Sequence, residues 1–218
     1  MNKLITYEEA ANLVRNGDTI MVGGFLAVGT PEKLIDALIA KGLQELTLIC
    51  NDTGFVDRGV GKMVVAKMFT KIMASHIGTN RETGRQFLEG ETEVELIPQG
   101  TLIEQIRAGG FGLGGVLTKT GLGTEVEKGK MIININGEDY LLEKPLRANV
   151  ALLYAEKADE SGNLTYHGTT RNFNPYMGAA ADLVIVEAKE IVKVGEISPD
   201  DVIVPGIFVD HIVYGGAE

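Results

Sequence analysis

The 218-residue chain has little of several features that would narrow its function quickly. Its single cysteine, Cys50, cannot form an internal disulfide, and no cysteine cluster has the spacing of a metal site. No apolar run is long enough to cross a bilayer, and charged residues interrupt the N-terminal segment where a signal peptide would need an apolar core. Basic residues are in the minority, and the formal net charge of −10 disfavours nucleic acid and anionic membranes as partners. We therefore expect a cytoplasmic protein without a metal, membrane or nucleic-acid partner.

What the chain does have is the composition of an ordinary globular protein, with 44% hydrophobic and 23% charged residues. Its length fits a single domain over residues 1–218. Short apolar runs alternate with amphipathic segments, and the connections between them are short. This alternation is typical of βαβ units, so we expect an α/β fold: a mostly parallel central sheet with helices on both faces. A small hairpin is expected to turn at Asn136-Gly137.

Helices are expected where a capping residue precedes an amphipathic segment. Thr6 and Glu9 form one predicted capping box, and Thr101 and Glu104 form another. Thr30 is the expected cap of the helix that follows it. The predicted helices span residues 6–17, 31–41, 81–90, 101–109 and 174–181; the predicted strands span 19–22, 46–50, 71–77, 93–97, 150–159 and 183–190, with the hairpin at 131–143.

Glycines and neutral amides follow the predicted strands, at the sheet edge where α/β proteins bind ligands. Gln99 and Asn51 carry neutral donors of the kind that stabilise an oxyanion when a thioester or anhydride carbonyl is attacked. Either amide can instead serve only to tie down its own loop. The residues in question are Gly23 and Gly24 after the first strand, Asn51 and Asp52 after the second, Ser75 and His76 after the third, and Pro98, Gln99 and Gly100 after the fourth.

The segment "TIMVGGFLAVGTP" (19–31) has a strand-loop-helix pattern around its paired glycines. Glycine costs backbone entropy, so a pair indicates either a tight turn with positive φ or a ligand that approaches the main chain closely. The spacing matches neither the Walker A nor the Rossmann fingerprint. Both interpretations remain open on the residues alone.

Other candidate motifs are explained by ordinary structural roles. "GFGLGG" (110–115) fits G-x-G-x-x-G, but it follows a predicted helix instead of a strand, so we interpret it as a mobile or partner-facing loop. Cys50 lies inside an apolar run and is expected to be a packed strand residue. His76 is nearer the sheet edge, yet a lone histidine is more often structural, and His167 and His211 have no recognisable partners. No Ser-His-Asp arrangement and no metal-ligand set can be assigned.

Taken together, several motifs resemble one enzyme family. The run "NGDTIMVGGFLAVGTP" (16–31) resembles the signature of the A (α) subunit of family I CoA-transferases, and in particular its acetate and butyrate–acetoacetate branch. The resemblance continues through "NDTGFVDRGVG", "SHIGTNRETG", "IPQGTLIEQIRAGGFGLGGVLTKTGLGT", "YLLEKPLRA" and "RNFNP". It therefore covers nearly the whole chain.

The resemblance implies transfer of CoA between a short-chain acyl-CoA and a free acid such as acetoacetate, butyrate or acetate. Such enzymes work by ping-pong kinetics through a glutamyl-CoA intermediate. The family's nucleophilic glutamate lies in a Ser-Glu-Asn-Gly motif of the B (β) subunit, and this chain has no such motif; "DESGN" (159–163) differs in order. The resemblance thus implies CoA as a substrate, no permanently bound cofactor, and a β-subunit partner in an A2B2 assembly.

The resemblance also assigns residues. It implies CoA binding by the loop of Gly23, Gly24, Phe25, Leu26, Ala27, Val28 and Gly29. Gln99 matches a glutamine whose amide helps to hold the oxyanion, and Asn51 matches an active-site asparagine nearby.

Two alternatives come from other functional classes. A sugar-phosphate isomerase on a related fold would need its own general base and a basic phosphate site at the strand ends, and no convincing lysine or arginine set is present there. A metabolite-sensing module would normally be joined to an output segment, whereas this sequence starts directly with its first predicted helix. Both alternatives predict that the purified chain acts or binds alone.

Overall fold

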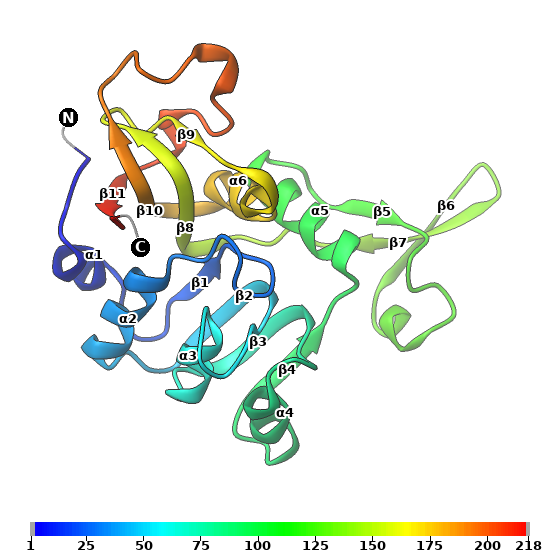
Figure 1. The fold of residues 1–218 in the computed structure, drawn as a ribbon. Coiled ribbons are helices and arrows are strands. Elements are labelled where there is room, and N and C mark those ends of the chain that lie inside the picture. Colours follow the sequence, from blue (N-terminus) through cyan, green and yellow to red (C-terminus); the bar gives the residue numbers. More distant parts are fainter. Residues whose placement is uncertain (1–2, 217–218) are drawn as a thin grey trace.

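Parallel strands dominate the computed structural model, which describes residues 3–216. Seven strands pair in the order β11-β10-β8-β1-β2-β3-β4, and every neighbouring pair is parallel (Figure 1). A short strand, β9, adds antiparallel to β8. The bounds are β1 Thr19–Val22, β2 Leu46–Asp52, β3 Phe69–His76, β4 Glu93–Leu96, β8 Ala148–Asp159, β9 Leu164–Thr165, β10 Ala181–Val192 and β11 His211–Tyr214. The mostly parallel sheet is confirmed.

Helices cover both faces of this sheet, as the sequence predicts. Successive residues of β1 point to opposite faces. Ile20 is buried in the apolar layer that contains α1, α2 and α3, and Met21 in the layer that contains α5 and α6. The bounds are α1 Tyr7–Leu13, α2 Glu32–Lys41, α3 Gly61–Val65, α4 Arg81–Leu88, α5 Gln99–Gly110 and α6 Asn174–Met177.

A second, three-stranded sheet forms an arm that extends away from the central sheet (Figure 1). Its antiparallel strands are β5 (Val116–Thr118), β7 (Glu138–Glu143) and β6 (Met131–Ile135), with β7 in the middle. The turn between β6 and β7 has positive φ at Asn136 (53°) and Gly137 (86°). The predicted hairpin is therefore confirmed, and β5 is an additional strand.

The predicted N-terminal cap is confirmed at α1, whereas the predicted caps of α2 and α5 are wrong. At α1 the Thr6 Oγ1 accepts a hydrogen bond from the Glu9 N–H at 3.1 Å, and Glu9 accepts one from the Thr6 N–H at 2.8 Å, so this capping box is confirmed. Thr30 does not cap α2, because the N-cap position is Pro31, which has no side chain to accept a bond.

The predicted capping box of Thr101 and Glu104 is also wrong. The helix α5 begins two residues earlier, at Gln99, with Pro98 at its N-cap, because the fixed φ of proline suits a helix entry. Thr101 is buried within the first turn, and Glu104 instead pairs with Arg107 at 2.5 Å.

Several boundaries are set by tertiary contacts that have no local signal. The first helix ends at Leu13 instead of Gly17, and β3 starts at Phe69 instead of Lys71. The sequence does not predict the short elements α3, β9 and β11. β9 pairs with the longer β8, β11 pairs with the longer β10, and α3 contacts the longer helices α2 and α4.

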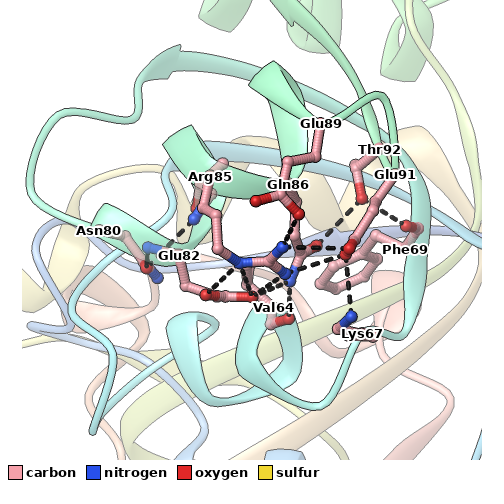
Figure 2. A network of polar contacts seen from close by, with 11 residues as sticks. Val64, Lys67, Phe69, Asn80, Glu82, Arg85, Gln86, Glu89, Glu91 and Thr92 are labelled. Carbon is pink, nitrogen blue, oxygen red and sulfur yellow. Dashed lines mark hydrogen bonds and ion pairs between the residues drawn. The ribbon is translucent and has the colours of Figure 1, made fainter.

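Helix α4 is attached to the molecule through polar contacts (Figure 2). Gln86 is 2% exposed; its Nε2 donates to the Val64 carbonyl at 2.8 Å, and its Oε1 lies 3.0 Å from the Thr92 hydroxyl. Arg85 lies on the outer side, where it pairs with Glu82, Glu89 and Glu91. Gln86 therefore joins α4 to α3 in a buried position, whereas the arginine cluster is partly exposed.

Candidate functional site

The strand order of the central sheet reverses between β1 and β8. From β1 the chain proceeds to β2, β3 and β4 on one side, while β8, β10 and β11 lie on the other. In open α/β sheets this reversal opens a crevice at the carboxyl ends of the strands, where ligands bind. The predicted glycine loop, Gly23–Gly29, directly follows β1 at this point.

The glycine loop has a strained backbone. Phe25 and Val28 exchange two backbone hydrogen bonds, of 3.1 and 2.9 Å, which close a tight turn. The two residues at its tip, Leu26 (φ 48°) and Ala27 (φ 67°), lie in the left-handed region although neither is glycine. Each such residue costs on the order of 1 kcal/mol. The turn keeps Phe25, Leu26 and Val28 partly exposed, at 44%, 36% and 44%.

Two asparagines of the "RNFNP" segment hold the glycine loop in this shape. Asn172 donates through Nδ2 to the Val28 carbonyl at 2.9 Å and accepts through Oδ1 from the Gly24 N–H at 3.2 Å. Asn174, which is fully buried, donates to the Gly29 carbonyl at 2.9 Å and accepts from the Tyr154 N–H of β8 at 3.0 Å. The loop is therefore fastened across the reversal point.

The paired glycines are required by this packing. A Cβ on Gly23 would collide with the side chain of Asn174, and a Cβ on Gly24 would collide with Thr30. Gly24 also has a φ of 129°. At both positions another side chain of the protein fills the space that a Cβ would occupy. Packing within the chain is therefore enough to require the two glycines.

Asp52 connects the glycine loop with the predicted site residue Asn51. Its Oδ2 accepts from the Leu26 N–H at 3.0 Å and from the Asn51 Nδ2 at 2.6 Å, while its Oδ1 accepts from the Gly54 N–H at 2.8 Å. The other end of the Asn51 amide accepts from the Ser75 hydroxyl at 3.1 Å. Asn51 is 3% exposed, so it is placed to support the loop from beneath.

A second loop repeats the first along the chain. "GFVDRG" (54–59) has the same Gly-Phe-x-x-x-Gly pattern as "GFLAVG" (24–29), and Phe55 bridges Arg58 as Phe25 bridges Val28. The two loops follow neighbouring strands and are in contact, because a Cβ on Gly59 would lie 3.0 Å from the Cβ of Ala27. The repeat is visible in the sequence but was missed there.

Gln99 lies at the same edge of the sheet but not beside the glycine loop. It is the exposed first residue of α5, directly after β4. Three strand-to-strand steps separate β4 from β1, which corresponds to about 14 Å at ordinary strand spacing. The structure thus links Asn51 to the loop through Asp52, whereas Gln99 makes no hydrogen bond to either of them.

The outer side of the glycine loop opens onto a cleft of about 750 Å³. Its lining carries cations and carboxylates: Lys33, Arg58, Lys62 and Lys189 together with Glu32, Asp36 and Glu187, besides residues 26–30, Tyr154, Thr170 and residues 215–216.

Glu187 is the buried carboxylate of this cleft, with 6% of its surface exposed. It accepts from the Leu34 N–H at 2.7 Å, which supplies the N-terminal cap that Pro31 cannot give to α2. Burial raises the pKa of Glu187 to about 7, and the hydrogen bond from Leu34 and the nearby Lys33 oppose this rise. No local sequence pattern marks this residue, because it belongs to β10, far along the chain from the glycine loop.

The remaining sequence candidates stay outside this site. Cys50 is 2% exposed within β2, and burial raises the pKa of its thiol. The glycine-rich segment 110–115 begins at the last residue of α5 and leads into β5, so it is no strand-to-helix phosphate loop. Within residues 3–216, no group of three or more histidine, cysteine or acidic side chains could hold a metal ion. None of the helices in that range is long and apolar enough to span a membrane.

Comparison with known sequences gives consistent matches over almost the full length. A family model described as coenzyme A transferase matches residues 4–215. The chain is 54% identical to the acetate CoA-transferase subunit alpha of Escherichia coli K12, covering 97% of this chain and 96% of that one. It is 51% identical to the acetoacetyl-CoA:acetate/butyrate CoA transferase alpha subunit of Clostridium acetobutylicum, with 97% of both chains covered.

Solved structures share the fold at lower identity. An acyl-CoA transferase from E. coli O157:H7, in a thioester complex with CoA, has a TM-score of 0.87 at 20% identity; the match covers 97% of this chain and 46% of that one. Glutaconate coenzyme A-transferase from Acidaminococcus fermentans has a TM-score of 0.85 at 20% identity, over 98% of this chain and 76% of that one. The fold thus corresponds to about half of the longer acyl-CoA transferase chain.

Proposed function

Because this chain belongs to the coenzyme A transferase family, we propose that it is the α subunit of a short-chain acyl-CoA:carboxylate CoA-transferase. The proposed substrates are acetyl-CoA or butyryl-CoA with acetoacetate, acetate or butyrate as the acceptor acid. The names and high identity of the E. coli and C. acetobutylicum alpha subunits support this choice. The observation that carries it in this chain is the glycine loop, rigidly fastened at the reversal point of the sheet.

The proposed chemistry divides the site between an α and a β subunit. A glutamate of the β subunit attacks the acyl carbonyl of acyl-CoA and releases CoA thiolate, which leaves an acyl-glutamyl anhydride. The thiolate then attacks the glutamyl carbonyl, which releases the acid and leaves glutamyl-CoA. The acceptor acid reverses both steps. Asp52 and Glu187 are unsuited to the nucleophile's role, since each already accepts backbone hydrogen bonds inside the protein.

The glycine loop contributes a fixed backbone surface for CoA or for the active-site loop of the β subunit. Within Gly23–Gly29, the N–H groups of Ala27 and Gly29 donate no hydrogen bond to the described residues, while the other five are used internally. Ala27 and Gly29 both line the cleft. Backbone donors held in advance are suited to polar groups of a ligand, since they need no reorganisation on binding.

The two amide side chains, Gln99 and Asn51, have different proposed roles. Exposed Gln99 is the proposed oxyanion donor, acting where the β subunit completes the site. Asn51 supports the glycine loop through Asp52. An amide suits the first role because it donates without a positive charge that would pair permanently with the nucleophilic carboxylate.

The proposed assembly is an A2B2 heterotetramer in the cytoplasm, with two copies each of the α and β subunits, CoA as substrate and no permanently bound cofactor. The names of the relatives, which designate them as alpha subunits, support a second kind of subunit. The net charge of −10 supports the absence of nucleic-acid or membrane partners.

The test is reconstitution. The chain is expressed alone and with the β subunit encoded nearest to it, and acetoacetate-dependent CoA transfer from butyryl-CoA and acetyl-CoA is assayed. We expect activity only in the mixture, with CoA trapped on a glutamate of the β subunit in the absence of acceptor. Turnover by the isolated chain would overturn the division of roles.

A further inference from the structure

The edges of the two sheets differ in how they are protected. An open edge strand offers unpaired backbone groups to other chains, and natural proteins block it with charge, with covering chain or by keeping it short. On β4, Glu93 and Glu95 both pair with Lys71 of β3, at 2.9 and 3.1 Å. On β11, Ile212 exchanges backbone hydrogen bonds with Lys3 and Ile5. Both edges of the central sheet are thus protected.

The arm has one short edge and one bare edge. Strand β5 has only three residues. Strand β6, "MIINI", has five residues with no charge and no proline, and its register with β7 is unbroken by a bulge. Met131, Ile132 and Ile135 are 63%, 46% and 42% exposed. Of the four edges in residues 3–216, only this one lacks a recognised form of protection.

One face of the arm is mostly apolar and partly exposed as well. The opposite face is covered at Leu141, which is 0% exposed, because the chain at Gly121 and Val126 packs there. The partly exposed face, which we call the arm face, ends in the open edge of β6. Cross-strand pairing and alternation place seven residues on it: Leu117, Met131, Ile133, Ile135, Glu138, Tyr140 and Leu142. Glu138, at its far end, pairs with Lys119 at 2.9 Å.

We propose that β6 pairs antiparallel with β6 of a second copy of this chain, which joins the two arms into one six-stranded sheet. In such a two-fold contact each strand faces itself, so a charged residue near the axis would lie opposite its own copy, which is destabilising. Strand β6 has no charged residue, so no register of this self-pairing places like charges opposite each other. The pairing satisfies the bare backbone groups and makes the two arm faces continuous.

Cysteine cross-linking tests this contact in the chain alone and in the complex with the β subunit. Single cysteines replace residues 131–135 one at a time, and the native Cys50 is buried and inaccessible. Around a two-fold axis the separation of equivalent residues grows by roughly 7 Å per position, so only positions at the axis can form a disulfide. We expect a covalent dimer of this chain that peaks at one or two adjacent positions. Leu88→Cys, exposed on α4, is the control that should not cross-link.

Light scattering supplies a second measurement that needs no activity. The isolated chain should have twice the 23.4 kDa mass of the monomer. Lysine at the position of 131–135 where cross-linking peaks should raise the dimer dissociation constant by roughly tenfold or more, because two lysines then face each other, whereas Leu88→Lys should leave it unchanged. A monomeric wild-type chain, or β6 cysteines that cross-link to the β subunit instead of to each other, would overturn the proposal. Neither readout depends on the proposed CoA transfer.

Discussion

Leu26 and Ala27 adopt left-handed backbone conformations that glycine would adopt at lower cost. Three side chains hold the loop in that conformation: Asp52, Asn172 and Asn174. The strain is therefore sustained by a set of specific hydrogen bonds and not by the loop's own sequence. A loop held this way keeps its shape before a ligand arrives.

Removing one holding residue should loosen the loop without unfolding the chain. Asn172→Ala deletes the bonds to the Gly24 N–H and the Val28 carbonyl. In the assembled enzyme we expect KM for acyl-CoA to rise more than kcat falls, because binding to the loop is affected first. Asn149→Ala is the matched control, since its side chain accepts from the Thr19 N–H at the start of β1, the opposite end from the loop. Equal kinetics in the two variants would refute the holding role.

Unlike the residues that hold the glycine loop, Gln99 is exposed, and its amide makes no hydrogen bond to residues 3–216. Gln99→Ala should lower kcat of the complex roughly a hundredfold, the usual effect of losing one oxyanion donor, about 3 kcal/mol. Complex formation, followed by size-exclusion chromatography, should be unchanged. The exposed Gln44→Ala should behave as wild type. An unaltered kcat for Gln99→Ala would remove the oxyanion role.

At the level of elements, helix α4 is attached by two sets of polar contacts that contribute unequally to the free energy of unfolding. Gln86 makes its hydrogen bonds in a buried position, while the Arg85 side chain is 34% exposed and its partners Glu89 and Glu91 are 54% and 34% exposed. Breaking a buried hydrogen bond leaves a polar group without water, whereas exposed ion pairs are screened. The ion pairs of Arg85 therefore contribute less to the free energy of unfolding than the buried hydrogen bonds of Gln86 do.

Urea unfolding of two α4 variants measures this difference. Gln86→Ala should lower the free energy of unfolding by about 1–3 kcal/mol, because the Val64 carbonyl loses its buried donor. Arg85→Ala should have a smaller effect, which shrinks further in high salt. A larger loss for Arg85→Ala than for Gln86→Ala would contradict this order.

The elements that sequence reasoning found are those whose burial leaves a local pattern. Buried parallel strands are continuous apolar runs, so "TIMV" and "LTLIC" were recognised. β11 was missed because its four residues become a strand only by pairing with β10. The starts of α2 and α5 were misplaced because a proline, and not the threonine beside it or after it, occupies the N-cap.

The candidate site was predicted in part for a similar reason. The glycine loop, Asn51 and Gln99 follow strands, and that position is visible in the sequence. Asn172, Asn174 and Glu187 reach the loop and its helix from over a hundred residues away, and no local pattern pairs them. Their contacts exist only once β8 and β10 lie beside β1.

For the whole molecule, Glu187 couples stability to pH. Its pKa of about 7 in the folded state is above that of an unfolded glutamate, so the folded state binds a proton more tightly. The stabilisation is complete below about pH 4.5 and is lost as pH rises through 7. The total is roughly 3 kcal/mol. Thermal unfolding between pH 4.5 and 7.5 should show this loss in the wild type and not in Glu187→Gln.

An exposed carboxylate provides the control for that measurement. Glu8→Gln, on the surface of α1, should follow the wild-type profile. If Glu187→Gln also follows it, the carboxylate of Glu187 does not link folding to this pH range.

The half-exposed ring of Phe25 at the head of the glycine loop also makes the loop optically accessible. The chain contains no tryptophan, so Phe25→Trp would introduce its sole indole fluorophore, beside the cleft and the residues that fasten the loop. Emission from this single position would report the polarity around the loop directly. Arrival of CoA and docking of the β subunit could then be timed separately by stopped-flow mixing.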